Sequence, residues 1–439
     1  MSNTFQYKQV WTSEYQKSNW AMPVYPVIAD LRFQDGLKVG DTVNRRYRSN
    51  PIFAKTMAST GAYVVQNYVE SNETFTISKL REASVRIVDA EVLNTDLNAT
   101  KSYGAQLANA LFQEIDGDTL NTARAGAGTT IDDGSFTGGT SGNGVTVSSN
   151  NVTDIPTMAT EIFTGKNVAY NNNIRFGKLP FDDYGGMLCW IVPPQVQTEI
   201  QRYLLSRGTP LGDQVVTNGY RGRFGDFEVF ASNNLPFTAR LTLGAVLPTD
   251  GDTFTIKGVT FRLKDTIAAN GDIDIGAGTV AETCTNIAAA LNALTTDSAT
   301  FDSFVDGTDT LTENGFTINK SHNGALHGIS ATAGSTYVDI LIKGSGKVTL
   351  SSSFVSASNL WTAAKQVVHS IIMVGKNVSL AVRKDPGIYE NFVSNAVAKD
   401  YVMWTVYDNK VFVDQARAII DLCVRCDSSN FATYSNVHA

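Results

Sequence analysis

The chain has 439 residues, of which 43% are hydrophobic and 18% charged, a composition that predicts a packed protein of about three domains and excludes wholesale disorder. Its formal net charge of −7 argues against a surface that coats nucleic acid, because phosphate binding requires clustered Lys and Arg. The chain opens without the basic and apolar regions of a secretory signal, and it has no apolar run of about 18 residues that would predict a membrane span. Its four cysteines show no disulfide framework, which suits a reducing compartment.

An extended N-terminal part comes first. Residues 1–45 are polar and aromatic, and we expect them to form an arm. Within residues 46–93, segments 75–77 and 84–87 alternate apolar with polar side chains, as strands do. The pattern predicts an extended loop after the arm.

Apolar side chains then recur every four residues, which is the spacing of one face of a helix. They are Tyr103, Leu107, Leu111 and Ile115. Asn98 is a suitable N-cap, and Gly126 follows the last apolar turn. We predict one long helix of about 25 residues, which spans roughly 38 Å.

Shorter elements follow the long helix. Asp154 opens a second helix. The continuous apolar run 187–192 predicts a buried strand, and Pro193-Pro194 begins a helix with one apolar face. Residues 227–231 alternate as a strand that leads into a turn at 232–236.

The C-terminal part is expected to consist mostly of strands. These strands are residues 370–374, 378–382, 401–407, 410–413 and 418–424. Asp408-Asn409 lies between two of them and is a signal for a two-residue hairpin turn.

Composition changes sharply between residues 241 and 360. This segment contains no Trp and no Met, and it carries twelve acidic against six basic residues, so its net charge is −6. Segments 254–256 and 259–261 alternate as strands around Lys257-Gly258. A helical stripe follows, made of Ile287, Leu291 and Leu294. We predict an inserted β-rich domain with one helix.

Residues suited to catalysis or metal binding are few. The chain has four histidines, and His322 and His327 have no third ligand nearby, which favours a solvated loop. Residues 302–309 are acidic but lack the closing Glu of a calcium loop, so we interpret them as acidic surface. His369 begins an apolar strand, and we interpret it as a hydrogen-bonded residue at a sheet edge.

Cys423 and Cys426 have the two-residue gap of a zinc knuckle. A zinc site needs a second such pair or a matching pair of histidines, and neither follows. In a strand, two side chains at this spacing also point to opposite faces. We therefore predict no catalytic, cofactor-binding or metal-binding residue.

A basic cluster lies where the arm meets the extended loop. It consists of Arg45, Arg46, Arg48 and Lys55. With so few charges the cluster is a poor nucleic-acid patch, whereas Arg pairs bidentately with carboxylates, so we interpret it as a subunit contact. Alternation in a strand places Arg46 and Arg48 on one face and Arg45 with Tyr47 on the other.

Three pieces and their order point to a known family. They are the helix around 107–115, the unit MLCWIVPPQVQTEIQRYLL at 187–205, and DFEVFASNNLP at 226–236. Preceded by an arm and an extended loop, they resemble the Hong Kong 97-type major capsid proteins of tailed double-stranded DNA bacteriophages. The resemblance covers residues 1–240 and 361–439.

The resemblance implies an α+β capsid fold with an inserted β-rich domain. Its parts are an N-terminal arm (1–45), an E-loop (46–93), a spine helix with the peripheral and first part of the axial domain (94–240), the insertion domain (241–360), and the remainder of the axial and peripheral domains (361–439).

A structural protein, not an enzyme, is what the resemblance implies. Its copies would associate as pentamers and hexamers into an icosahedral shell that encloses DNA without sequence-specific binding. The expected partners are other copies of the chain and scaffolding and portal proteins, with a decoration protein as a further candidate; no cofactor and no membrane is expected. The expected location is the virion, and the host cytoplasm during assembly.

Two alternatives remain open. An encapsulin-type nanocompartment shares the fold and encloses enzymes, but the large insert argues against it. A β-rich carbohydrate-active enzyme is the other alternative, and the scarcity of His and the absence of an acid–base constellation argue against that.

Overall fold

The computed structural model describes most of the chain. The described residues are 23–31, 42–48, 54–57, 59–65, 70–88, 99–163, 188–206, 222–244, 246–266, 272–275, 278–293, 310–313, 316–319, 328–344, 346–392 and 398–426. Several parts of the chain for which the sequence made predictions lie outside the described residues, namely most of the arm, Asn98, Leu294, residues 302–309, His322 and His327.

The chain forms two compact units, each built from separate stretches of sequence. Unit 1 comprises Met1–Met22, Asp30–Ile115 and Ser379–Phe412. Unit 2 comprises Pro23–Ala29, Asp116–Val378 and Val413–Ala439. The long helix α3 (Ala99–Ala125) contributes to both, and its 27 residues confirm the helix expected from the four-residue spacing.

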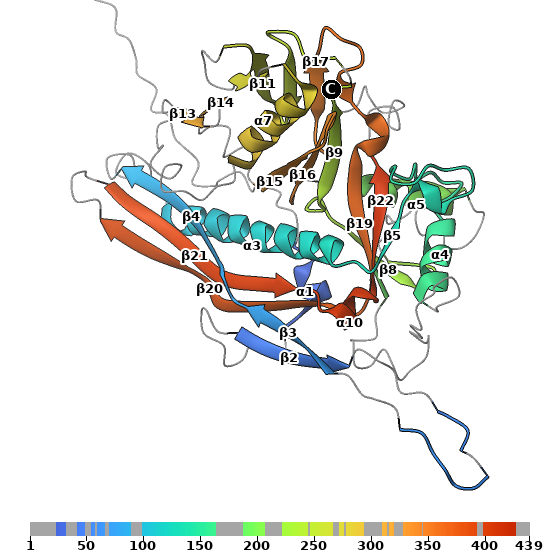
Figure 1. Ribbon diagram of the computed structural model, residues 1–439. Helices are drawn as coiled ribbons and strands as arrows, with labels where there is room; N and C mark the ends of the chain where they lie inside the picture. The colour runs from blue at the N-terminus through green and yellow to red at the C-terminus, as the bar shows by residue number, and fades with distance from the viewer. Residues whose placement is uncertain are drawn as a thin grey trace, which may run out of the picture. The chain divides into compact units, whose positions relative to one another are not determined.

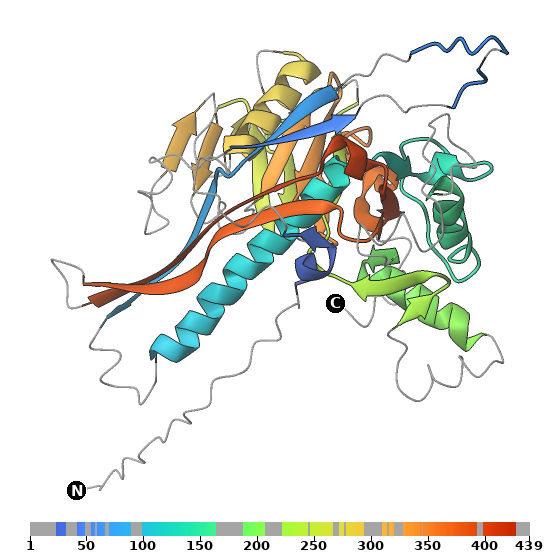
Figure 2. The same cartoon turned by 90° about the horizontal axis from the view of Figure 1, so that it is seen from below.

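Unit 1 is built on a sheet of four strands (Figure 1). In spatial order they are β1 (Ala29–Asp30), β20 (Val378–Phe392), β21 (Ala398–Lys410) and β4 (Lys79–Val88), and β21 is antiparallel to both β20 and β4. The helix α3 lies along one face of this sheet (Figure 2). There, Leu107 and Leu111 of α3 pack against Tyr401 and Met403 of β21. Side chains spaced four residues apart on the helix and two residues apart on the strand thus form one apolar layer between them.

A hairpin covers part of the other face of this sheet. Its strands are β2 (Thr42–Arg48) and β3 (Glu70–Thr76), paired antiparallel over their full length. Phe75 of β3 is buried in a cluster with Val406 and Phe412, and its ring meets Phe412 edge-on at 6.4 Å between centroids. This aromatic contact fixes the base of the hairpin on unit 1.

The expected hairpin turn at Asp408-Asn409 is wrong. β21 runs without a break to Lys410, where Asp408 and Asn409 pair with Ala381 and Leu380 of β20. Asp408 accepts hydrogen bonds from the backbone N and the hydroxyl of Ser78. The side chain of Asp408 thus forms its hydrogen bonds with a residue distant in sequence and not with the backbone of a local turn. Residues 413–416, which the sequence assigned partly to a strand, begin a short helix, α10 (Val413–Ala416).

Unit 2 contains a sheet of ten strands. They are β5 (Thr129–Ile131), β6 (Leu188–Val192), β7 (Arg223–Phe224), β8 (Phe227–Ala231), β9 (Phe237–Thr242), β15 (Ile329–Ala333), β16 (Tyr337–Ile342), β18 (Leu360–Trp361), β19 (Val367–Val374) and β22 (Ile419–Arg425). β19 is an interior strand, which pairs with β22 along one edge and with β9 and β6 along the other, and it is buried at all eight positions.

Helices accompany the ten-stranded sheet in unit 2. They include α1 (Tyr25–Ile28), α4 (Asp154–Phe163), α5 (Pro194–Leu205) and α10. The expected unit of buried strand, proline pair and helix is confirmed by β6 and α5, in which Val196 and Ile200 are buried. No helix among the described residues is both long and apolar enough to cross a membrane.

A second, six-stranded sheet of unit 2 lies wholly within residues 253–353. Its strands are β13 (Thr310–Glu313), β14 (Phe316–Asn319), β12 (Asp272–Asp274), β11 (Val259–Lys264), β10 (Thr253–Ile256) and β17 (Leu350–Ser353). β10 and β11 form the hairpin expected around Lys257-Gly258, and both turn residues have positive φ, 52° and 81°. The helix α7 (Val280–Ala293) packs on strands of both sheets of this unit.

Candidate assembly surface

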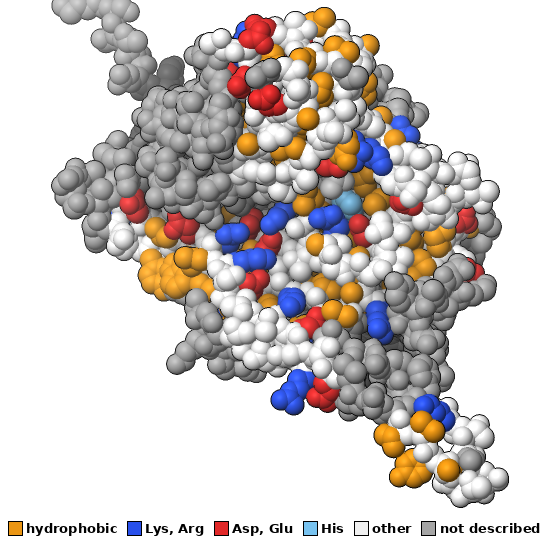
Figure 3. All heavy atoms as spheres, viewed as in Figure 1, with side chains coloured by type: hydrophobic (Ala, Val, Ile, Leu, Met, Phe, Trp, Pro, Cys, Tyr) orange, Lys and Arg blue, Asp and Glu red, His pale blue; other side chains and the backbone are white. Residues whose placement is uncertain are grey.

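The strands β2 and β3 lead to an exposed loop segment, which we call the loop tip and define as residues 54–57 and 59–65. All of these residues are exposed. Four of them carry large apolar side chains, namely Met57 (62% exposed), Tyr63 (77%), Val64 (76%) and Val65 (74%). Figure 3 shows hydrophobic side chains gathered at this tip. An apolar group of this kind on an outlying loop is typical of a surface that another molecule covers.

The basic cluster expected from the sequence is divided by the alternation of β2. Arg45 is half-buried, and its guanidinium carbon lies 4.6 Å from the centroid of the Phe412 ring. Arg46 is exposed on the opposite face of the hairpin, next to Asn72, its cross-strand partner. Arg45 therefore contacts its own unit, whereas Arg46 faces outward.

The other two members of the cluster differ in position. Lys55 belongs to the exposed loop tip. Arg48 ends β2 opposite Glu70, and its side chain lies outside the described residues. Arg46 and Lys55 are thus the two basic side chains of the cluster that the described structure presents to solvent.

Two further exposed apolar side chains lie on the sheet of unit 1. Leu80 of β4 is 61% exposed and Tyr389 of β20 is 49% exposed. The Tyr389 ring stacks on Trp404 of β21 with 6.2 Å between centroids. Strand register places Leu80 and Trp404 on the face opposite α3, because each alternates with residues that pack on the helix.

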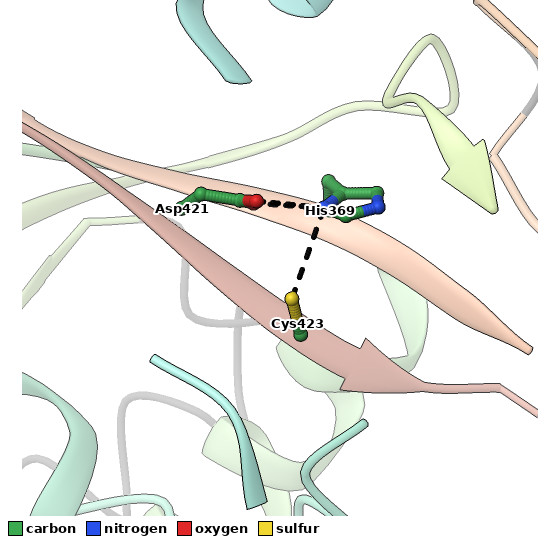
Figure 4. Close-up of side chains that lie close together, drawn as sticks. All are labelled: His369, Asp421 and Cys423. Atoms are coloured by element: carbon green, nitrogen blue, oxygen red, sulfur yellow. Dashed lines mark hydrogen bonds and ion pairs between the residues drawn. The ribbon is translucent and has the colours of Figure 1, made fainter. Parts of the chain in front are cut away.

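Unit 2 contains a polar cluster that the sequence did not indicate (Figure 4). Nδ1 of His369 lies 2.9 Å from both carboxylate oxygens of Asp421 and 3.9 Å from Sγ of Cys423. Nε2 of the same ring lies 2.9 Å from the hydroxyl of Thr238. Burial, and then the nearby Asp421 and Asp132 carboxylates, raise the pKa of the Cys423 thiol.

His369 is hydrogen-bonded, as expected, but its interpretation as an edge residue is wrong. β19 has neighbours along both of its edges, and His369 is 6% exposed. Cys423 and Asp421 reach it through the pairing of β19 with β22, so their proximity depends on residues 52 to 54 positions apart. The spacing of Cys423 and Cys426 is visible in the sequence, but Cys426 is not part of this cluster.

Comparisons with known proteins give no match by sequence: no protein-family model and no curated protein matches the chain. A solved structure from Mycobacterium phage Che8 matches it with a TM-score of 0.51 and 9% identity, over 94% of this chain and 96% of that one. The chain has the Hong Kong 97-type fold.

Two further solved structures are similar at lower scores. The capsid structure of the cyanophage P-SCSP1u has a TM-score of 0.47 and 10% identity, over 96% of this chain and 93% of that one. A structure from Gordonia phage Cozz has a TM-score of 0.44 and 11% identity, over 96% and 92%.

Proposed function

We propose that this chain is the major capsid protein of a tailed bacteriophage, and that its copies associate as pentamers and hexamers into an icosahedral head around double-stranded DNA. The Hong Kong 97-type fold, shared over 94% of the chain with a structure from a phage, supports the proposal. The net charge of −7 is compatible with a container that encloses DNA without binding it tightly, although many other proteins share such a charge.

The observation that carries the proposal is the loop tip. In a monomer, Met57, Tyr63, Val64 and Val65 leave most of their apolar surface in water. Burying a side chain such as Val or Met contributes roughly 1.5–3 kcal/mol, so a neighbouring copy that covers the tip gains several such contributions. The tip repeats in every subunit, and the same contact therefore forms throughout a closed shell.

Basic side chains and the two exposed apolar side chains of the unit 1 sheet add to this support. Arg46 on β2 and Lys55 in the loop tip are exposed and suit carboxylates on a neighbour, and we extend that proposal to Arg48 because alternation places it with Arg46. Leu80 and Tyr389 offer a further apolar contact on unit 1. Obligate interfaces of this kind bury more than about 2,000 Å² in total.

Scaffolding and portal proteins, with a decoration protein as a further candidate, belong to the proposal as partners in assembly. They rest on the family resemblance alone. Co-expression of the chain with the neighbouring open reading frames of its genome, followed by purification of heads, tests them.

The experiment that tests the function is expression of the full chain, followed by light scattering and negative-stain microscopy. We expect capsomers or closed shells, with shell formation increasing under crowding. A monodisperse, stable monomer across salt and crowding conditions contradicts the proposal. Shells that enclose a discrete cargo enzyme in the native host, in place of DNA, favour the encapsulin-type alternative.

A further inference from the structure

Three potential metal ligands share one face of two paired strands in unit 2 (Figure 4). In the antiparallel register of β19 and β22, His369 lies directly opposite Cys423. Asp421 precedes Cys423 by two residues, so its side chain emerges on the same face of the sheet. The ligand atoms of the three residues all lie within 4.8 Å of one another.

We propose that His369, Asp421 and Cys423 bind a divalent zinc-type metal ion. Imidazole nitrogen, carboxylate oxygen and thiolate sulfur are the three donor types that Zn²⁺ accepts, whereas Ca²⁺ and Mg²⁺ require oxygen ligands. Three protein ligands leave a fourth position for water. The Cys423 proton passes to solvent when the thiolate binds the metal.

The distances between the donor atoms fit this assignment. In a tetrahedral zinc site with a Zn–N bond of about 2.0 Å and a Zn–S bond of about 2.3 Å, neighbouring donors lie roughly 3.3–3.6 Å apart. His369 Nδ1 is 2.9 Å from the Asp421 oxygens and 3.9 Å from Cys423 Sγ, so the required spacing lies between the two distances. The third pair, an Asp421 oxygen and Cys423 Sγ, lies within 4.8 Å, so side-chain shifts on the order of 1 Å complete the site.

The surroundings of His369 also fit a metal ligand. A ring that binds a metal through Nδ1 must carry its proton on Nε2, and Nε2 lies 2.9 Å from the hydroxyl of Thr238. A hydroxyl can donate or accept, so Thr238 partners the ring with or without metal. Thr238 is on β9, the other neighbour of β19, and pairs with Val367. Three adjacent strands thus position the site.

Access and charge set two further conditions. Cys423 is the least buried of the three residues, so the cluster comes nearest to solvent on its side. The charged groups that act on its thiol are Asp421, Asp132, Arg124 and Lys365. Two are carboxylates and two are cations, so the cluster has no excess of positive charge to oppose a metal ion.

The site is independent of the loop tip, which belongs to unit 1. A metal here joins β19 to β22 and binds only the folded chain, so it stabilises unit 2. At a free metal concentration 100 times the dissociation constant, we expect the unfolding temperature to rise by roughly 3–6 °C.

The test uses the full chain, stripped of metal by a chelator and titrated with Co²⁺. We expect one equivalent per chain, a thiolate-to-cobalt charge-transfer band in the near ultraviolet, and displacement of the band by Zn²⁺. Cys423→Ser should abolish the band and the thermal shift. Asp421→Asn, which is nearly isosteric, should weaken metal binding at least tenfold.

Cys426→Ser is the matched control, because it also removes one thiol close to the end of β22 but lies outside the cluster. It should keep the cobalt band and the thermal shift. Circular dichroism in chelator establishes that each variant folds, and Asp421→Asn carries the test if Cys423→Ser does not fold. Absence of the band in the wild-type chain, the same band in a folded Cys423→Ser variant, or an unchanged cobalt affinity in a folded Asp421→Asn variant overturns the proposal.

Discussion

Asn234 donates its side-chain amide to the carboxylate of Asp116 across 2.7 Å, although the two residues are 118 positions apart. The other oxygen of Asp116 accepts hydrogen bonds from the backbone N–H groups of Val24 and Tyr25 at 2.7 and 2.6 Å. Asp116 has no exposed surface. One buried carboxylate on α3 therefore holds the start of α1 and the turn after β8 in place within unit 2.

Replacement of Asp116 is expected to destabilise unit 2 strongly. Asp116→Ala removes the acceptor from three largely buried donors, which should lower the free energy of unfolding by about 3–5 kcal/mol. Asn234→Ala removes one of the three bonds and should cost about 1–2 kcal/mol. Denaturant unfolding followed by tryptophan fluorescence compares the two. Equal effects of the two substitutions would show that the carboxylate does not join the three segments.

The same carboxylate should make stability depend on pH. Burial raises the pKa of Asp116 above its ordinary value of 3.8, and the hydrogen bonds from Asn234, Tyr25 and Val24 only partly oppose this. Between 3.8 and the folded-state pKa, the folded chain retains a proton that the unfolded chain has released. The contribution of Asp116 to stability is therefore largest below this window and falls as the pH rises through it.

Asp116→Asn replaces the carboxyl group with an amide of nearly the same shape that does not titrate, so this variant is the matched comparison for the wild type. The difference in unfolding free energy between wild type and Asp116→Asn should decrease as the pH rises above 3.8 and become constant once the carboxyl is fully ionised. Denaturant titrations at a series of pH values measure it. A difference that grows with pH would contradict the raised pKa.

The loop tip should be needed for assembly and not for folding. Tyr63→Ser combined with Val64→Ser removes exposed apolar surface, so thermal unfolding of the monomer should stay unchanged while the yield of shells falls several-fold. Val355→Ser is the control, because Val355 is equally exposed, at 79%, but lies in the segment 241–360. Equal loss of shells from both would mean that the effect is not specific to the tip.

Arg45 and Arg46 are neighbours in sequence with different expected roles. Arg45→Ala removes the cation–π contact with Phe412 and should lower stability by about 0.5–1 kcal/mol. Arg46→Glu together with Arg48→Glu should leave stability nearly unchanged and slow assembly, by reversing charge on the outward face of β2. The serine versions should have a milder effect that high salt mimics in the wild type. Normal shells in normal yield from the double Glu variant would exclude these residues as a subunit contact.

Residues 241–360 should form a domain only with the strands at their borders. β16 pairs with β9 along six residues, and Trp361 of β18 donates its indole N–H to Ser351 and packs against Phe254. A fragment of residues 236–362 should therefore unfold cooperatively, whereas residues 244–359 should be much less stable. Circular dichroism melting and the dispersion of amide NMR signals compare the fragments. Equal stability of the two fragments would mean that residues 244–359 form the complete domain and that the bordering strands do not contribute to its stability.

Local patterns predicted the elements whose neighbours are close in sequence. The stripe from Tyr103 to Ile115 is enough to specify α3, and the positive-φ turn at Lys257-Gly258 is enough to specify the hairpin of β10 and β11. The turn predicted at Asp408-Asn409 was wrong because Asp408 is hydrogen-bonded to Ser78, which is 330 residues away. The residues around Asp408 carry no signal for a partner so distant in sequence.

The candidate sites show the same division. The clustered Arg residues are visible in the sequence, but which of them face outward depends on Phe412, far along the chain. Tyr63, Val64 and Val65 have the composition of a core strand, and only the folded chain shows that they are exposed. The pairing of His369 with Cys423 follows from the register of two strands, which the sequence does not encode locally.

The ladder between β4 and β21 has a consequence for synthesis of the chain. β4 ends at Val88, whereas its partner begins at Ala398, so a growing polypeptide exposes the edge of β4 on the ribosome until about 300 further residues have been translated. Unit 2 has most of its sequence, Asp116–Val378, available before that moment. An unpaired strand that waits so long is open to association with other nascent chains, and premature contacts of this kind compete with orderly assembly.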